Sequence, residues 1–219
     1  MDETFPAVLP AAIAVMAIGL LPMLVVMGTA FTKISIVLML VRNAIGVQQA
    51  PSGMVINSIA LTLTIFIIVP LGDSVIREMQ SANLKLTEWK DVVGSYDILA
   101  RNFSQYLARF TSERELSFFM DAARKLWPET LHHQITRTNI FVLLPSHVTS
   151  ELTRAFEIAF LLYLPFVIVD LIVSNILLAM GAMMVPPTMI SLPIKILLFV
   201  ASDGWAILLH NLVLSYAKG

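Results

Sequence analysis

Residues 155–214 read AFEIAFLLYLPFVIVDLIVSNILLAMGAMMVPPTMISLPIKILLFVASDGWAILLHNLVL, an apolar tract that only a few charged side chains interrupt. A helix of about 20 apolar residues is long enough to cross a bilayer, so the tract has room for two such helices. The adjacent Pro186-Pro187 cannot continue a helix and favours a turn. The tract therefore predicts a hairpin of two long apolar helices, at about 148–181 and 188–216, with its turn near 182–192.

A second pair of apolar stretches lies in the first third of the chain. Residues 4–32 and 43–72 contain no charged side chain, and each stretch is long enough to span a membrane as a helix. They predict helices at about 8–41 and 54–80, which form another hairpin with a turn near 43–53.

The bulk composition is too apolar for an ordinary soluble domain. Of 219 residues, 58% are hydrophobic and 13% are charged, against about 45–50% and about 25% in soluble proteins. Lipid or partner chains must therefore cover much of the surface. A formal net charge of −1 gives no basic excess for nucleic acid, and the absence of cysteine excludes disulfides and thiolate metal sites. The acidic start, Met1-Asp2-Glu3, argues against a cleavable secretory signal.

The middle of the chain has a different composition. Residues 73–146 hold nine basic and nine acidic side chains, and two amphipathic patterns there predict helices near 96–110 and 116–126. Ser112 with Glu115 forms a capping-box pattern before the second helix, which Pro128 ends. The middle segment is therefore expected to be a small helical domain outside the bilayer.

These observations predict an all-α fold, in which four long hydrophobic helices form membrane-associated hairpins around a small helical insertion. The expected domains are an N-terminal hairpin at 1–80, a polar helical domain at 81–146 and a C-terminal hairpin at 147–219. The end of the first predicted helix and the short loop after it carry Lys33 and Arg42 without any acid. Because such loops tend to stay in the cytoplasm, the insertion is expected on the opposite, periplasmic side of the membrane.

Six ionisable side chains are set within the C-terminal apolar helices, where each costs about 2.5–3.5 kcal/mol to insert. The first three are spaced three residues apart and share one helix face, and the last two are eight apart, again on one face. They could form a local ladder of salt bridges, a polar face buried between subunits, or a proton relay. The six are Glu151, Arg154, Glu157, Asp170, Lys195 and Asp203.

Methionines gather at the predicted C-terminal turn, Met180-Gly181-Ala182-Met183-Met184-Val185-Pro186-Pro187. Methionine is flexible and polarizable, so it adapts to varied surfaces. A ring of such turns could form a deformable hydrophobic seal, although methionine could equally fill a membrane core.

No pattern in the sequence indicates a catalytic centre or a cofactor site. The His132-His133 pair has no third ligand at metal-binding spacing. Ser146-His147 is not part of a nucleophile elbow, and the sequence has no phosphate-binding loop. We therefore expect neither an enzyme nor a bound cofactor.

Four separated motifs resemble, in order, those of the FliP/SctR family of type III secretion export-gate proteins. The resemblance covers about residues 20–216, and the short length favours injectisome over flagellar members. The motifs are Phe31-Thr32-Lys33 with Leu40 to Gln49; Leu144-Pro145 with Ser150 to Ile158; Leu164-Pro165-Phe166 with Asp170-Leu171; and Pro193 to Phe199 with Asp203-Gly204-Trp205.

The resemblance implies a function in protein export. Five copies would assemble with FliQ/SctS-type and FliR/SctT-type subunits into a gate that passes unfolded polypeptides across the inner membrane. Its constriction would be formed by Met180, Met183 and Met184, with Ala182 in place of a further methionine. Contacts between subunits would involve Glu151, Arg154, Glu157, Lys195 and Asp203.

Two other classes of membrane protein are alternatives. A small-solute channel or ion-coupled carrier would depend on titration of Asp170 or Glu157. An intramembrane protease would need a matched pair of catalytic groups, and the sequence shows no such pair.

Overall fold

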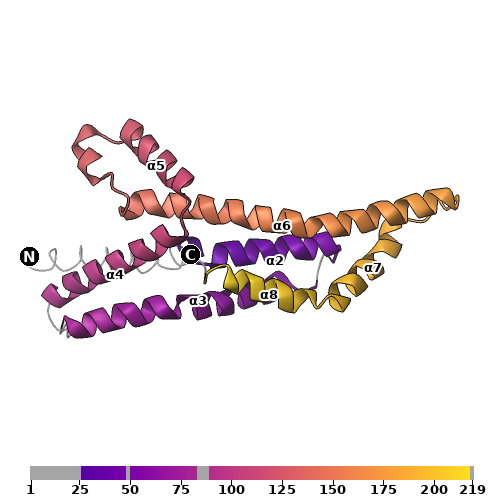
Figure 1. Cartoon of the computed structure of the whole chain (residues 1–219), viewed down its shortest axis with the longest axis horizontal. Helices are drawn as coiled ribbons and strands as arrows, with labels where there is room; N and C mark the ends of the chain where they lie inside the picture. Colours follow the sequence, from indigo (N-terminus) through magenta and orange to yellow (C-terminus); the bar gives the residue numbers. More distant parts are fainter. Residues whose placement is uncertain (1–25, 48–49, 83–88, 218–219) are drawn as a thin grey trace, which may run out of the picture.

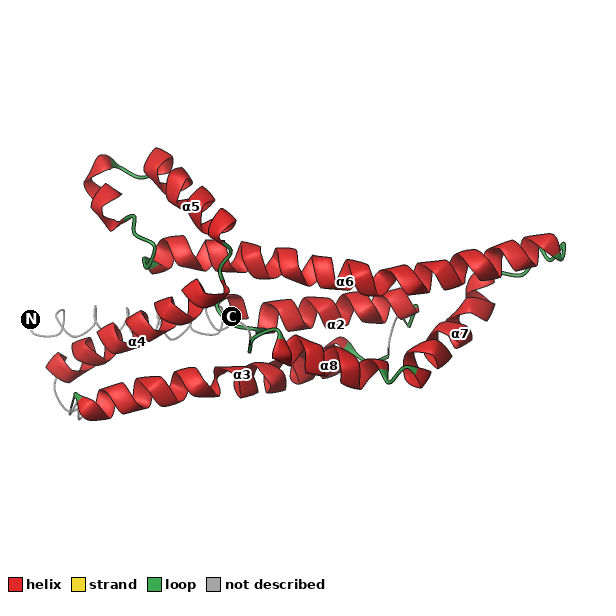
Figure 2. Cartoon of the chain, in the orientation of Figure 1, coloured by secondary structure: helices red, strands yellow, loops and turns green. Residues whose placement is uncertain are grey.

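The computed structural model describes residues 26–47, 50–82 and 89–217, and these residues form helices without any β-strand (Figures 1 and 2). The elements in chain order are α2 (Phe31–Ile45), α3 (Gly53–Ser81), α4 (Trp89–Phe110), α5 (Glu113–Leu126), the 3-10 turn η1 (Glu129–Gln134), α6 (Ile140–Ala179), α7 (Pro187–Ala201) and α8 (Gly204–Leu214).

Two of the predicted long helices are present. The helix predicted at 54–80 is α3, where the Ser52 side chain accepts a hydrogen bond from the Val55 backbone N–H. The helix predicted at 148–181 is α6, but α6 begins earlier, because Asn139 caps it by accepting from the backbone N–H of Phe141 at 2.8 Å. Its first turns therefore lie in the range that the sequence assigned to the polar insertion.

The single helix predicted at 188–216 is wrong, since the chain breaks there into α7 and α8 with a bend of 59°. Asp203, at the break, has a left-handed backbone with φ of 52°. Gly204 follows it because a Cβ atom at that position would lie 2.8 Å from the backbone oxygen of Phe199 and against its ring. The break is thus fixed by a close approach that only glycine allows.

The first helix also differs from its predicted bounds in the residues that the structure describes. A turn at residues 28–30 precedes α2, which continues beyond the predicted end and stops at Gly46 with φ of 94°. The part of the prediction at residues 8–25 lies outside the described residues. With 15 residues, α2 is shorter than a membrane span requires.

The expectation of four long hydrophobic helices is therefore not confirmed. Within the described ranges, two helices, α3 and α6, are long and apolar enough to cross a membrane, or three spans if the bent α7–α8 pair counts as one.

The polar helices agree with the sequence. Both amphipathic patterns are helical as α4 and α5, and α5 ends at Leu126 before Pro128. Ser112 is the N-cap residue of α5, yet its side chain makes no capping bond. Instead its backbone N–H donates to the Ser150 hydroxyl of α6 at 2.9 Å, which ties the start of α5 to the long helix.

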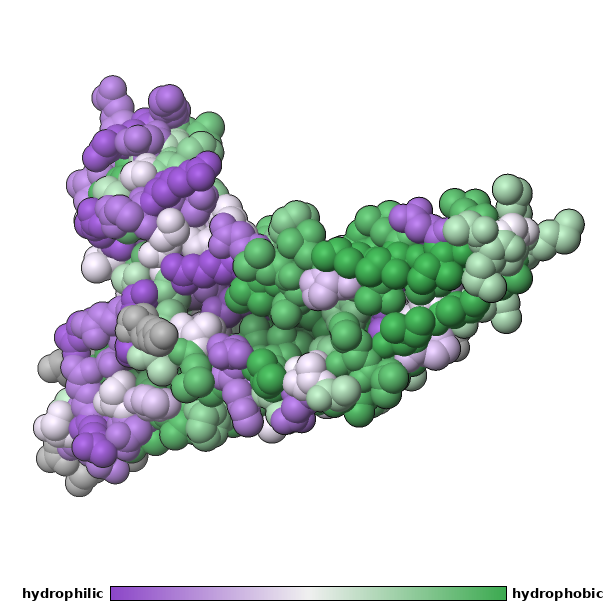
Figure 3. All heavy atoms as spheres, turned by 45° about the vertical axis from the view of Figure 1, so that its right-hand side comes forward, coloured by the Kyte–Doolittle hydropathy of each residue, from purple (hydrophilic) through white to green (hydrophobic). Residues whose placement is uncertain are grey.

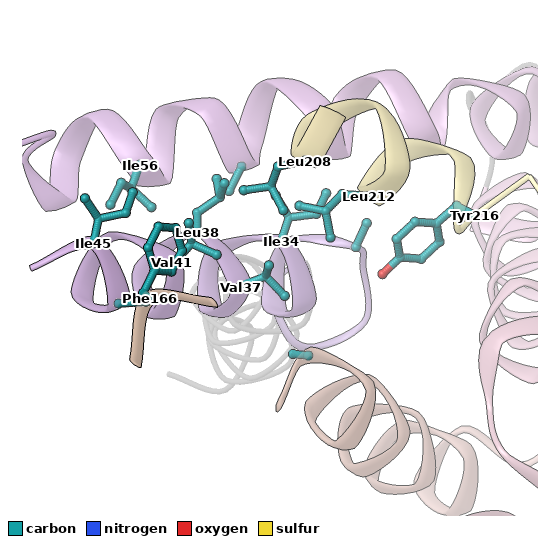
Figure 4. Close-up of a cluster of buried hydrophobic side chains, with 14 of the residues drawn as sticks. Ile34, Val37, Leu38, Val41, Ile45, Ile56, Phe166, Leu208, Leu212 and Tyr216 are labelled. Atoms are coloured by element: carbon teal, nitrogen blue, oxygen red, sulfur yellow. The ribbon is translucent and has the colours of Figure 1, made fainter. Parts of the chain in front are cut away.

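Helix α2 lies at the centre of the bundle and packs against α3, α6 and α7. Its side chains Ile34 and Leu38 are fully buried in a cluster with Leu208 and Leu212 of α8 (Figure 4). This cluster positions the charged side chains described below.

The break between α7 and α8 gives a first prediction. Changing Gly204→Ala should lower the free energy of unfolding by about 1–3 kcal/mol, because the added methyl group displaces Phe199. Thermal unfolding in detergent measures this. Gly72→Ala in α3 is the control, since no atom lies within 4 Å of its added Cβ. Equal melting temperatures for both variants would contradict the steric explanation.

Candidate functional site: buried ion pairs and an exposed methionine turn

The Glu151 carboxylate is the centre of a buried polar cluster. It is completely buried, and one of its oxygens lies 3.3 Å from the Lys33 ammonium, which is 2% exposed. The Tyr216 hydroxyl donates to the same oxygen. The Arg154 guanidinium donates to the other oxygen at 3.2 Å and to the Phe110 backbone carbonyl at 2.9 Å.

Aromatic rings surround this cluster. The Lys33 ammonium lies 3.6 Å from the centre of the Tyr216 ring. That ring packs edge-on against the Phe110 ring, and the two ring centres are 5.0 Å apart. Burial, reinforced by the Glu151 carboxylate, raises the pKa of Tyr106 to about 12. The same two causes raise the pKa of Tyr216. Both hydroxyls therefore stay neutral at physiological pH.

The cluster joins four parts of the chain that are distant in sequence. Lys33 belongs to α2, Glu151 to α6, Phe110 to the end of α4, and Tyr216 follows α8. Buried charges are costly to desolvate unless each has a partner and hydrogen bonds. The cluster thus fixes one arrangement of these helices, because any other would leave a charge unpaired.

A second ion pair lies nearer the methionine turn. The Lys195 ammonium of α7 lies 2.6 Å from an Asp170 carboxylate oxygen of α6 and donates to the Ala44 carbonyl at 3.3 Å. Ala44 is in the last turn of α2, where a cation is favoured by the exposed carbonyls and the helix dipole. Lys195 therefore joins three helices at once.

Of the residues predicted to contact other subunits, some form ion pairs within the chain and others are exposed. Glu151 and Arg154 pair with each other across one helix turn, as a local ladder would. Glu157 is exposed and makes no ion pair within the described ranges. Asp203 is exposed at the helix break, so its predicted position on one continuous helix face with Lys195 is wrong. Contacts of these residues with other subunits remain a prediction.

Sequence reasoning missed two members of the cluster. From the sequence, Lys33 is only a loop charge that sets orientation, but in the structure it is buried, so the charge-based orientation depends on Arg42 alone. A lysine in an otherwise apolar stretch signals a buried acidic partner, and Glu151 is that partner. No pattern in the sequence singles out Tyr216.

The methionine turn is the most exposed apolar part of this end of the molecule. It joins α6 to α7 at the tip of the hairpin (Figure 1), with Gly181 at φ of 74°. The exposed fractions of the three methionine side chains are large: Met180 74%, Met183 79% and Met184 97%. The turn is therefore available to contact another chain or a substrate.

Among the residues described, no group of three or more His, Asp or Glu side chains could hold a metal ion. Lys33, Glu151 and Arg154 form one set of ion pairs, and Asp170 with Lys195 forms another. Many large apolar side chains of α3 and α6 are exposed. Fold and site together define an all-helical, membrane-associated chain whose apolar surface must be covered by lipid or protein. Comparison with known proteins identifies it further: the chain belongs to the FliP family, whose model matches residues 14–212. The resemblance seen in the sequence is thereby confirmed.

Several curated relatives are similar over nearly their whole length. The chain is 45% identical to Yop proteins translocation protein R of Yersinia pestis over 90% of this chain and 91% of that protein. It is 44% identical to the probable translocation protein y4yL of Sinorhizobium fredii, over 99% and 97%. It is 40% identical to the surface presentation of antigens protein SpaP of Salmonella typhi, over 90% and 91%.

The buried pair gives a second prediction. Lys33→Met should lower the free energy of unfolding by about 3 kcal/mol, because it leaves the buried Glu151 carboxylate with Arg154 as its only cation. Adding Glu151→Gln should recover part of the loss, since the uncompensated charge is then gone. Thermal unfolding in detergent measures both variants.

The control is the exposed pair of Arg77 and Asp73, separated by 2.9 Å. Arg77→Met should change stability by no more than about 1 kcal/mol. If Lys33→Met unfolds at the same temperature as Arg77→Met, the central role of the buried cluster is refuted.

Proposed function

We propose that this chain is an export-gate subunit of a bacterial type III secretion system. The observation that carries the proposal is the family membership, with 40–45% identity to proteins named for translocation and antigen presentation at the surface. The fold is compatible, since its apolar helices demand a membrane or other subunits. In this role five copies form the entry pore for unfolded polypeptides in the inner membrane, together with FliQ/SctS-type and FliR/SctT-type subunits.

The proposed arrangement puts the polar helices α4 and α5 on the periplasmic side. In this proposal the methionine turns of the five copies meet at the axis of the pore. Flexible apolar side chains can pack against one another when the pore is empty. They can also pack around an extended polypeptide of varied composition. Such a gate needs no catalytic group of its own, and the energy for transport comes from partner proteins or the proton gradient.

A carrier or ion channel built from this chain alone is the weaker candidate. Coupling to ions would need an acid in the helices that is free to titrate. Asp170 is held by Lys195 at 2.6 Å, which suits a structural charge. The exposed Glu157 is more consistent with a contact to another subunit.

The seal has a direct test in cells that express the complete secretion system. Replacing Met183 and Met184 together by Ser should leave assembly intact but let small ions leak, because hydroxyl groups hydrate the closed constriction. A fluorescent reporter of cytoplasmic ion content measures the leak. Met54→Ser, an equally exposed methionine at the start of α3, is the control. A tight membrane in the double variant would refute the seal.

The contacts between subunits need variants that do not disturb the single chain. Reversing Lys195 would place a second acid beside Asp170, so loss of assembly there would have two explanations. Glu157→Gln avoids this problem because the side chain is exposed and the change adds no cation beside Lys33, Arg109 and Arg154. It should reduce the pentamer at least several-fold on native gels without lowering the melting temperature of the single chain. Glu129→Gln in η1, also at an exposed position, is the matched control, and equal pentamer yields would exclude Glu157 from the interface.

A further inference from the structure

The methionine turn concentrates the oxidisable sulfur of the chain. The sequence has twelve methionines and no cysteine, so methionine is its only sulfur-containing side chain. Within the described ranges, the methionines exposed by 70% or more are Met54 at the start of α3 and a group of four at the tip of the α6–α7 hairpin. These four tip methionines are Met180, Met183, Met184 and Met189, the last in the first turn of α7.

The backbone of the turn is held by hydrogen bonds that do not involve these sulfurs. The Ala182 N–H donates to the Leu177 carbonyl at 2.9 Å. The Gly181 N–H donates to the Leu178 carbonyl at 3.0 Å. Together with the left-handed backbone of Gly181, these two bonds form a Schellman motif, which satisfies two of the last carbonyls of α6. A chemical change at the exposed methionines therefore alters the surface of the tip and leaves its fold in place.

The turn lies in the apolar part of the molecule. Figure 3 shows hydrophilic side chains gathered at the end that holds α4 and α5, and hydrophobic side chains over the rest. The methionine turn is at the opposite end from α4 and α5 (Figure 1), and residues 171–194 carry no charged side chain. A polar group introduced at the methionines would therefore change the character of this surface directly.

A two-electron oxidant such as hydrogen peroxide supplies such a group. The methionine sulfur donates a lone pair to one peroxide oxygen, the O–O bond breaks, and the products are methionine sulfoxide and water. Sulfur is oxidised and the peroxide is reduced, so no further reactant is needed. The sulfoxide is polar and disrupts methionine-rich contacts, and dedicated reductases convert it back to methionine.

We propose that the methionine turn is an oxidation site, and that its conversion to sulfoxide opens the closed export gate to small ions. This inference rests on the function proposed above, in which the five turns close the pore. Water fills a closed pore up to the seal, so a small oxidant dissolved in it reaches the sulfurs there. The sulfoxide oxygens then hydrate the constriction, and the apolar seal is lost.

The site itself is tested on the purified full-length protein in detergent, treated with hydrogen peroxide and followed by peptide mass spectrometry. The four tip methionines should each gain one oxygen, about 16 Da, before Met79 and Met120 do, because those two are half-buried. The melting temperature should stay unchanged at this stage, since the backbone of the turn does not depend on the sulfurs. Equal rates of oxidation at the tip and at Met120 would refute a selective site.

The effect on the gate is tested in membrane vesicles from cells that express the complete secretion system. The measured quantity is the ion leak after peroxide relative to the leak before it. Peroxide should raise the leak of the unchanged protein toward that of the Met183→Ser, Met184→Ser variant. Changing all four tip methionines to leucine should remove this increase, because leucine has no sulfur to oxidise. Met54→Leu is the control, since Met54 is equally exposed but lies outside the turn, and it should keep the increase.

The outcomes separate this inference from the proposed function. If the serine variant leaks but peroxide does not open the unchanged gate, the seal stands and the oxidation site has no effect on it. If the leucine variant responds to peroxide as the unchanged protein does, the leak arises elsewhere and the inference is refuted. A serine variant that stays tight would instead refute the seal itself, and this inference with it.

Discussion

The fold depends on the buried charge of Glu151. Its carboxylate has no access to water and is matched by Lys33, Arg154 and Tyr216 from separate parts of the chain. Apolar packing is non-directional, so it restricts the register of the helices less strictly than a hydrogen-bonded charge does. A buried carboxylate allows no such freedom, because its partners must lie at hydrogen-bonding distance. The cluster therefore sets the register of α2 against α6 and holds the C-terminal end of α8 beside them.

The second pair, Lys195 with Asp170, has the same effect farther along α6. By capping the end of α2 through Ala44, it keeps α7 folded back toward the bundle while the methionine turn stays exposed. The α6–α7 hairpin that carries the proposed seal is thus held together by an ion pair, while the methionine side chains at its tip are largely exposed. This arrangement suits a seal whose backbone must be positioned accurately while its methionine side chains stay flexible.

The sequence predicted those features that depend on neighbouring residues. Pro128 predicted the end of α5, and Gly181 with Pro186-Pro187 predicted the methionine turn. The stretch without charged residues at 43–72 predicted α3. The sequence could not predict features set by distant residues. The break at Asp203 depends on how the Phe199 ring approaches Gly204. The burial of Lys33 depends on a carboxylate that follows it by more than half the chain, so the local pattern resembled a loop charge.

The length of α6 has a consequence for where this protein sits. Exposed apolar side chains follow it from Leu152 to Leu178, about 40 Å at the rise of an α-helix. The hydrocarbon layer of a bilayer is only about 30 Å thick. An upright α6 is thus longer than the hydrocarbon layer, so it must either tilt or have part of its apolar surface covered by protein. In the proposed assembly, neighbouring copies of the chain cover this surplus apolar surface.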